Sequence, residues 1–209
     1  MSHDEAPARR GRGRRPAAEV RASVLRAAAG LLLNSGIRAV TFDRVATAAG
    51  SSKMTLYKWW PSAGALAAEA FFAHSAQQLE FPDTGDIRAD LTSQLRAFVR
   101  LLNRDGTGAV IAGLIGNAQT DPELSAAFSK HYSAPRRALA LAAFEKARER
   151  GQLRDDIDLG ILVDQLWGAC YNRLLIPDAP LDEAYAVALV NNALDGAGPN
   201  PARRPGSRG

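Results

Sequence analysis

The sequence has very few of the residues from which metal centres and disulfides are built. It contains one cysteine, Cys170, and three histidines in 209 residues. A single cysteine cannot form an internal disulfide, so nothing in the chain requires an oxidising compartment. The histidines His3, His74 and His131 are far apart, and no Cys/His metal spacing or HExxH motif occurs. We therefore expect no metal ion and no cofactor.

Catalytic motifs are also missing. The sequence has no Gly-rich phosphate-binding loop, and no Ser/His/Asp or Cys/His set stands out. The acidic residues Asp155, Asp156 and Asp158 could suggest a cation site, but a cluster of charge at a helix start explains them better. The sequence therefore predicts that the protein is not an enzyme.

Long apolar runs and strand-like patterns are absent as well. No run approaches the roughly 20 residues that span a bilayer, and the N-terminus has arginines where a signal peptide has an apolar core. Period-two runs of Val, Ile and Thr do not occur, whereas Ala, Leu, Arg and Glu are abundant. These features predict an all-α, cytoplasmic protein without a membrane partner.

Charge is divided unevenly along the chain. Residues 1–60 hold 11 Lys and Arg against 4 Asp and Glu, whereas residues 61–195 hold 12 against 18. Residues 1–16 lack apolar periodicity, so we expect a disordered basic arm. A basic first quarter on an acidic body indicates a polyanion-binding segment on a body that does not bind polyanions. The arm residues that could contact phosphates or a narrow minor groove are Arg10, Arg12, Arg14 and Arg15.

Residues 41–62, TFDRVATAAGSSKMTLYKWWPS, contain the strongest local pattern. Thr41 is a suitable N-cap for one helix, and Gly50 provides the left-handed backbone of a tight turn. Ser52 then caps a further helix that stops at Pro61. Helix, glycine-containing turn and helix are the arrangement of a helix-turn-helix unit.

The second helix of this unit has two distinct faces. At 100° per residue, Leu56 and Trp60 lie together on the inward face, and Met54, Thr55 and Lys58 lie on the opposite face. A lysine suits a phosphate or a guanine, a threonine suits a phosphate or a base edge, and a methionine suits a thymine methyl. The outward face therefore suits a DNA groove better than it suits bulk solvent.

Together these residues resemble the DNA-binding head of TetR/AcrR-type transcriptional regulators. The match includes a preceding helix, and the residues that carry it are Thr41, Val45, Ala46, Ala49, Gly50, Ser52, Lys53, Thr55, Leu56, Tyr57 and the run Lys58-Trp59-Trp60-Pro61-Ser62. The resemblance implies a homodimer that places one recognition helix of each subunit in a major groove, and a helical body that binds a small molecule. By position, the family's DNA contacts fall on Thr41, Arg44, Ser52, Lys53, Met54, Thr55, Tyr57, Lys58 and Trp59.

The chain departs from the family pattern at two places. It has Ser51 where the family usually has an apolar residue, so the turn is expected to pack more loosely. It has Ala63 and Gly64 where the family usually has a lysine that contacts a phosphate. We expect the arginine arm to replace that contact.

The rest of the chain reads as a larger helical body. The expected organisation is an arm at 1–16, a helix-turn-helix domain at 17–61, a regulatory and dimerisation domain at 62–196 and a disordered tail at 197–209. The first domain begins with a helix from about Ala17 to Ser35. The body is expected to begin with a helix from Ser62 to about Leu79 and a second helix over 87–102. Gly106 and Gly108 interrupt the helices there, and the next helix carries Val110. A further helix starts at Asp121-Pro122, and the helix that ends at Arg150 either begins at Ser133 or continues the preceding one with a kink. The last two helices are expected to start at Asp158 and to span 181–194.

The helix after Asp158 is apolar around most of its circumference, so it is expected to be buried on two sides. The second side is most simply another subunit, and two such C-terminal helices from each of two chains would form a four-helix interface. The residues expected at this interface are Leu162, Leu166, Leu174, Tyr185 and Leu189.

An effector pocket among the middle helices would be largely apolar. Its candidate residues are Phe98, Asn117, Trp167 and Tyr171, each of which could instead belong to the core. Because no pattern of buried charge is visible in the sequence, a hydrophobic or aromatic ligand is favoured.

Three functions are compatible with these features. The leading one is a homodimeric regulator, most simply a repressor, that binds a palindromic operator and is released by a small hydrophobic effector. The alternative is a largely non-specific DNA-binding protein driven by the basic arm, with a steep salt dependence. A third function, an enzyme or small-molecule binder whose helix-turn-helix head has no role, would need a set of catalytic residues that the sequence lacks.

Overall fold

The computed structural model describes residues 16–75, 81–104 and 106–197. These residues form helices and connecting turns without any strand, so the predicted all-α class is confirmed. The helices are α1 (Ala17–Ser35), a 3₁₀ turn (Ile37–Ala39), α2 (Phe42–Ala49), α3 (Lys53–Trp59), α4 (Ala63–Ser75), α5 (Ile87–Asn103), α6 (Thr107–Ala118), α7 (Pro122–Phe128), a π-helical turn (Ser129–Ser133), α8 (Ala134–Glu149), α9 (Leu159–Leu175) and α10 (Glu183–Ala197).

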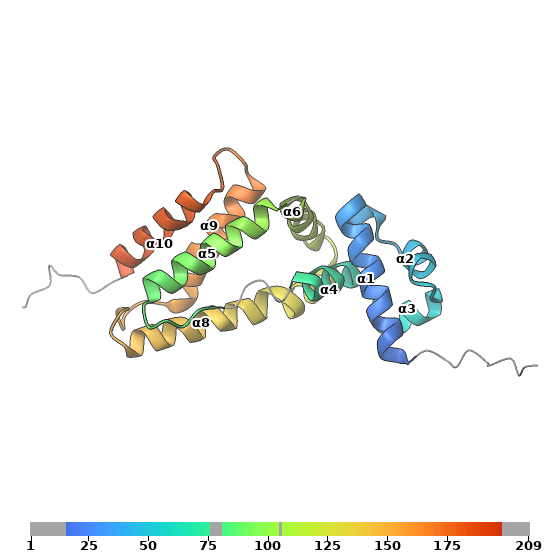
Figure 1. The fold of residues 1–209 in the computed structure, drawn as a ribbon, viewed down its shortest axis with the longest axis horizontal. Coiled ribbons are helices and arrows are strands. Elements are labelled where there is room, and N and C mark those ends of the chain that lie inside the picture. The colour runs from blue at the N-terminus through green and yellow to red at the C-terminus, as the bar shows by residue number, and fades with distance from the viewer. Residues whose placement is uncertain (1–15, 76–80, 105, 198–209) are drawn as a thin grey trace, which may run out of the picture.

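The helices form an elongated molecule with a small head at one end. Figure 1 shows α1, α2 and α3 gathered at that end, whereas α5, α8, α9 and α10 form the body at the other. The head has its own buried centre, in which Val24, Leu32, Val45 and Leu56 are fully covered. Because these residues recur at helical spacing on α1, α2 and α3, burying them fixes how the three helices pack.

Helix α4 connects the head to the body. It packs against α1 on one side and against α7 on the other. Its residues Leu66, Ala67, Ala68, Ala70 and Phe71 are all buried, which is expected of a helix that is apolar around most of its surface. The predicted end of this helix near Leu79 lies outside the described residues.

The segment around Pro135 continues one helical rod, as one of the two predicted alternatives had it. Helices α7 and α8 are joined by the π-helical turn, in which the Ala134 N–H donates to the Ser129 carbonyl five residues back. Proline has no N–H to donate within a helix and crowds the preceding turn. A local π-helical turn is one way in which a helix accommodates such an interruption.

Two other boundaries differ from the prediction. The last helix begins at Glu183 rather than at residue 181, because the Asp182 carboxylate accepts from the Tyr185 N–H at 2.7 Å and so caps it. Gly108 was expected to interrupt the helices but lies inside α6. Its role is steric, since a Cβ placed there would lie 2.5 Å from the Leu102 carbonyl oxygen of α5.

The close approach of α5 and α6 at Gly108 can be tested by adding one methyl group. Gly108→Ala is expected to lower the free energy of unfolding by about 1–3 kcal/mol, because the methyl overlaps a backbone oxygen. Gly116→Ala on the same helix places its methyl in open space. This variant should raise the free energy of unfolding by about 0.5–1 kcal/mol. Urea denaturation measures both changes, and a Gly108→Ala protein as stable as the Gly116→Ala protein would contradict the contact.

Candidate nucleic-acid interface and ligand cavity

The helix-turn-helix unit forms through the caps that its sequence predicts. The Thr41 hydroxyl accepts from the Arg44 N–H at 3.3 Å at the start of α2, and Gly50 ends that helix with φ 60° and ψ 39°. The Ser52 hydroxyl accepts from the Thr55 N–H at 3.2 Å at the start of α3. These local contacts determine where α2 stops and in which direction α3 leaves the turn.

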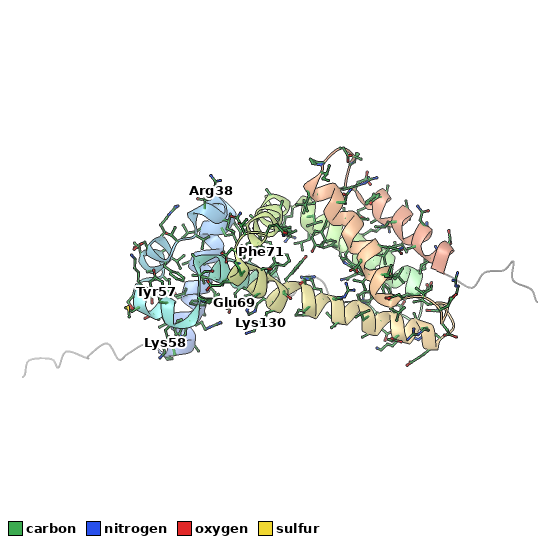
Figure 2. The ribbon with its side chains drawn as sticks, turned by 180° about the vertical axis from the view of Figure 1, so that it is seen from behind. Arg38, Tyr57, Lys58, Glu69, Phe71 and Lys130 are labelled. Carbon is green, nitrogen blue, oxygen red and sulfur yellow. The ribbon has the colours of Figure 1, made fainter. Side chains whose placement is uncertain are left out.

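Burial confirms the predicted faces of α3 for Leu56 and Trp60 inside and for Met54 and Lys58 outside. Thr55, which was expected on the outward face, is half-buried. Leu56 is fully buried and Trp60 is 3% exposed, whereas Met54 and Tyr57 are 77% and 59% exposed. Lys58 is exposed as well, and in Figure 2 Tyr57 and Lys58 lie at the head end of the molecule, away from the body. The helix therefore presents methionine, tyrosine and lysine side chains on one open surface.

Four other candidate residues at this surface, Ser52, Lys53, Thr55 and Trp59, already have partners. The Thr55 hydroxyl lies 2.9 Å from the Ser52 hydroxyl, and Lys53 forms an ion pair with Asp43 of α2. Trp59 is half-buried and packs edge-on against Trp60, with 5.6 Å between ring centroids. Thr41 and Arg44 are exposed at the start of α2. The arm residues Arg10, Arg12, Arg14 and Arg15 lie outside the described residues.

The two departures from the family pattern have structural counterparts. The Ser51 N–H donates to the Ala46 carbonyl at 2.9 Å, so the turn keeps its backbone bond with a serine at this position. A Cβ on Gly64 would lie 2.7 Å from Asp121 Oδ2 and 3.1 Å from the Leu124 Cβ. A side chain at position 64 would therefore require the Asp121 carboxylate to turn away and Leu124 to shift slightly.

A half-buried carboxylate that the sequence analysis missed joins the head to the body. Glu69 of α4 accepts from the Trp60 indole Nε1–H at 2.7 Å, and Arg21 Nη2 of α1 lies 2.5 Å from its other oxygen. His131 Nε2, from the π-helical turn, lies 3.9 Å from Glu69 Oε2. The Arg21 guanidinium also stacks over the Trp60 ring, 5.1 Å from its centroid. We call Glu69, Trp60, Arg21 and His131 the Glu69 cluster.

The Glu69 cluster holds the C-terminal end of α3 against α4 and α1. Its carboxylate is only 12% exposed, so its bonds are little weakened by water. Figure 2 shows Glu69 between the head and the start of the long α7–α8 rod, near Lys130. The signal in the sequence is the single charged residue of α4 in the run AGALAAEAFFA, because a lone carboxylate on an apolar helix needs a partner.

The body contains a cavity of about 410 Å³ between the π-helical turn, α8 and α9. Trp167 and Tyr171 line it, as the sequence analysis proposed. Phe98 is buried behind the wall, with its ring centroid 5.5 Å from that of Tyr171. Asn117 does not reach the cavity, because it is exposed on α6 and donates to the Gly113 carbonyl of its own helix.

The cavity wall also carries charge, which the sequence did not reveal. Arg136, Arg137 and Asp164 line it together with the aromatic residues. The Tyr171 hydroxyl donates to the Tyr132 hydroxyl at 2.8 Å. Burial raises the pKa of both tyrosines, so both hydroxyls keep their protons at neutral pH.

Two of the residues proposed for a subunit interface are buried inside this subunit. Leu162 and Leu166 are 1% and 0% exposed, so the prediction that they contact a partner is wrong. Leu174, Tyr185 and Leu189 are half-buried against the same core. The open face of α9 instead carries residues spaced four and three positions apart, namely Ile161, Gln165, Gly168, Asn172 and Leu175.

Reactive and metal-binding groups are scarce in the described part of the chain. No three His, Cys, Asp or Glu side chains there are grouped so that they could hold a metal ion. Burial raises the pKa of the Cys170 thiol to about 12, so it stays protonated and unreactive. None of the described helices is both long and apolar enough to cross a membrane.

Comparison with known proteins matches both parts of the chain to one family. Residues 24–70 match the family model of bacterial regulatory proteins of the tetR family. Residues 81–193 match the model of the tetracyclin repressor-like C-terminal domain. The chain belongs to the TetR family. This confirms the resemblance drawn from residues 41–62, and it makes the protein a helix-turn-helix transcriptional regulator rather than an enzyme.

Individual TetR-family proteins resemble it over most of their length. The crystal structure of the TetR-family transcription regulator SCO0332 is 56% identical, with a TM-score of 0.77 over 87% of this chain and 100% of that one. The uncharacterized HTH-type transcriptional regulator YdeS of Bacillus subtilis is 36% identical over 175 residues, 83% of this chain and 87% of its own. The DNA-binding transcriptional repressor TetR of Mycobacteroides abscessus is 29% identical over 174 residues, 83% of this chain and 90% of its own.

The Glu69 cluster predicts a stability effect unlike that of an ordinary surface carboxylate. Glu69→Ala is expected to lower the free energy of unfolding by about 1–3 kcal/mol, because it leaves the Trp60 N–H and the Arg21 charge without their acceptor. Thermal or urea unfolding measures this loss. Glu145→Ala, which removes an exposed partner of Arg148, should change stability little. Equal losses in the two variants would show that the cluster does not stabilise the junction.

Proposed function

We propose that the protein is a homodimeric one-component regulator, most simply a repressor, that binds a palindromic operator and releases it when a small molecule enters the cavity. The observation that carries the proposal is the division of α3 into a buried side at Leu56 and an open side at Met54, Tyr57 and Lys58. A short helix that is held by its buried side and exposes its opposite side suits insertion into a major groove. This activity would take place in the cytoplasm, where the DNA is.

The residues on the open side have distinct parts in this proposal. Lys58 contacts a phosphate or a guanine, and the Tyr57 hydroxyl donates to a phosphate. Met54 packs against a thymine methyl. Thr41 and Arg44 at the start of α2 contact the phosphate backbone beside the groove, where contacts position the head without reading sequence.

The open face of α9 supports a second copy of the chain as the partner. Ile161 and Leu175 near its ends are 56% and 44% exposed, and Gly168 lies exposed between them. Residues spaced four and three apart form the seam of packed helices. The neighbouring α10 exposes two small residues, Ala184 and Ala188, which would let a partner helix approach closely.

The π-helical turn offers a route from the cavity to the head. Ser129, Tyr132 and Ser133 of this turn line the cavity, and His131 of the same turn lies beside Glu69. A ligand that shifts the turn would therefore change the surroundings of the carboxylate that holds Trp60, and with it the position of α3. Two such heads in a dimer would then no longer match the spacing of their half-sites.

The DNA contacts can be tested with a double variant and a matched control. Thr55→Ala with Lys58→Ala is expected to weaken binding to the DNA upstream of the protein's own gene by about ten-fold or more. Thr120→Ala with Lys146→Ala removes the same side-chain types from exposed positions of the body and should leave binding unchanged. A mobility-shift assay in moderate salt with competitor DNA measures both. Absence of specific binding by the unaltered protein would contradict the proposal.

The same assay separates the alternative function. A non-specific DNA-binding protein driven by the arm would bind competitor and upstream DNA equally and lose affinity steeply with salt. Deleting residues 1–14 would then abolish binding altogether. Under the leading proposal this deletion weakens binding but keeps the preference for the operator.

The dimer can be tested by placing a charge on the open face of α9. Gly168→Glu is expected to convert the dimer to a monomer, because each copy brings a carboxylate to the same interface. Sedimentation equilibrium measures the mass directly. Ala142→Glu, at an exposed position of α8, should remain dimeric. An unaltered protein that sediments as a monomer would contradict the dimer.

A further inference from the structure

We propose that the cavity binds a planar aromatic carboxylate, with its charged group on Arg136 and its rings against Trp167. This inference rests on the proposed function, because it names the chemical class of the effector. It also replaces the expectation of a purely hydrophobic ligand.

Among the described residues, one positive charge of the wall, that of Arg136, has no carboxylate paired with it. Arg137 forms an ion pair with Asp164 and also donates to the Gly160 carbonyl at 3.1 Å. This pairing lowers the pKa of Asp164, so its negative charge is present and is engaged by Arg137. Arg136 lies over the Tyr132 ring, 4.5 Å from its centroid, and forms no ion pair within the described residues. An anion is therefore the ligand that would complete the charge balance of the wall.

A second donor lies beside this guanidinium. Because the Tyr132 hydroxyl accepts from Tyr171, its own hydrogen remains available for an acceptor in the cavity. Tyr132 is also the residue over whose ring Arg136 lies, so the two donors belong to one side of the cavity. A carboxylate has two acceptor oxygens and could bind both groups at once.

The remaining lining favours flat rings rather than a flexible chain. Trp167 and Phe81 line the cavity with their ring centroids 6.4 Å apart and tilted by 44°. Aromatic ligands gain from such surfaces through offset and edge contacts beyond the simple burial of area. The volume of about 410 Å³ is within the range of small-molecule sites.

The proposal can be tested with 2-naphthoate and its neutral amide, 2-naphthamide. Titration of the full chain without DNA, followed by calorimetry or by tryptophan fluorescence, is expected to show 2-naphthoate binding about ten-fold or more tightly than the amide. Decanoate, an aliphatic carboxylate, should bind more weakly than 2-naphthoate. An amide that binds as tightly as the acid would overturn the role of charge, and decanoate binding as tightly would overturn the preference for rings.

Variants of Arg136 connect this preference to the proposed contact. Arg136→Gln is expected to remove the preference for the acid over the amide, and Arg136→Lys should keep most of it. Arg148→Gln removes a charge from the same helix outside the cavity lining and should leave the preference intact. An unchanged preference in Arg136→Gln, with its unfolding temperature close to that of the unaltered protein, would overturn the proposal. If Arg136→Gln does not fold, Arg136→Lys becomes the deciding variant. Loss of the preference for the acid over the amide in Arg136→Lys would then overturn the proposed charge contact.

These outcomes are distinguishable from a failure of the proposed function. If 2-naphthoate binds through Arg136 but does not release operator DNA, the ligand class stands and the regulatory coupling is wrong. If the protein binds no specific DNA, the proposed function is wrong whatever the titration shows. If operator binding is normal and the amide equals the acid, only the inference about the ligand is wrong.

Discussion

The recognition helix is too short to be stable by itself. Helix α3 has seven residues, and isolated helices shorter than about 12–15 residues are marginal in water. It therefore depends on its attachments, which are the Ser52 cap at its start, Leu56 in the centre of the head and Trp60 at its end. Since Trp60 is held by Glu69 of α4, the direction in which the exposed side chains of α3 point depends on a residue of the connecting helix.

The π-helical turn contributes residues both to the cavity wall and to the Glu69 cluster. On the cavity side its neighbours include the Arg136 guanidinium, which forms no ion pair with any residue that the structure describes, and the hydroxyls of Tyr132 and Tyr171. On the other side, His131 lies beside the Glu69 carboxylate. A continuous α-helix would place successive residues at a regular 100°, whereas a wider turn changes which side chains face each way. The π-helical turn near Pro135 therefore lines the cavity and also lies beside the carboxylate that holds Trp60.

Local signals in the sequence were sufficient to predict the helices and turn of the head, but they did not predict how the helices of the body pack. Thr41, Gly50 and Ser52 act through bonds to residues a few positions away, so their roles were visible without the fold. Leu162 and Leu166 were assigned to the wrong partner, because helical periodicity shows that a face is apolar but not what covers it. Arg136 could not be singled out beforehand, since it is one of several arginines of the body and its place in the cavity wall depends on distant segments. Glu69 did carry a signal, as the single charged residue of an apolar helix, but its partners could not be read from the sequence.

The Glu69 cluster has a consequence for how the two parts of such regulators can be exchanged. Because the carboxylate sits in α4 but two of its partners, Arg21 and Trp60, sit in the head, a chimaera joined at Ser62 would leave Glu69 facing residues chosen for another protein. The family model of the head extends to residue 70 and so includes this position. A junction placed after Glu69 would carry the carboxylate together with both partners, and positions 21, 60 and 69 are expected to change together when related heads diverge.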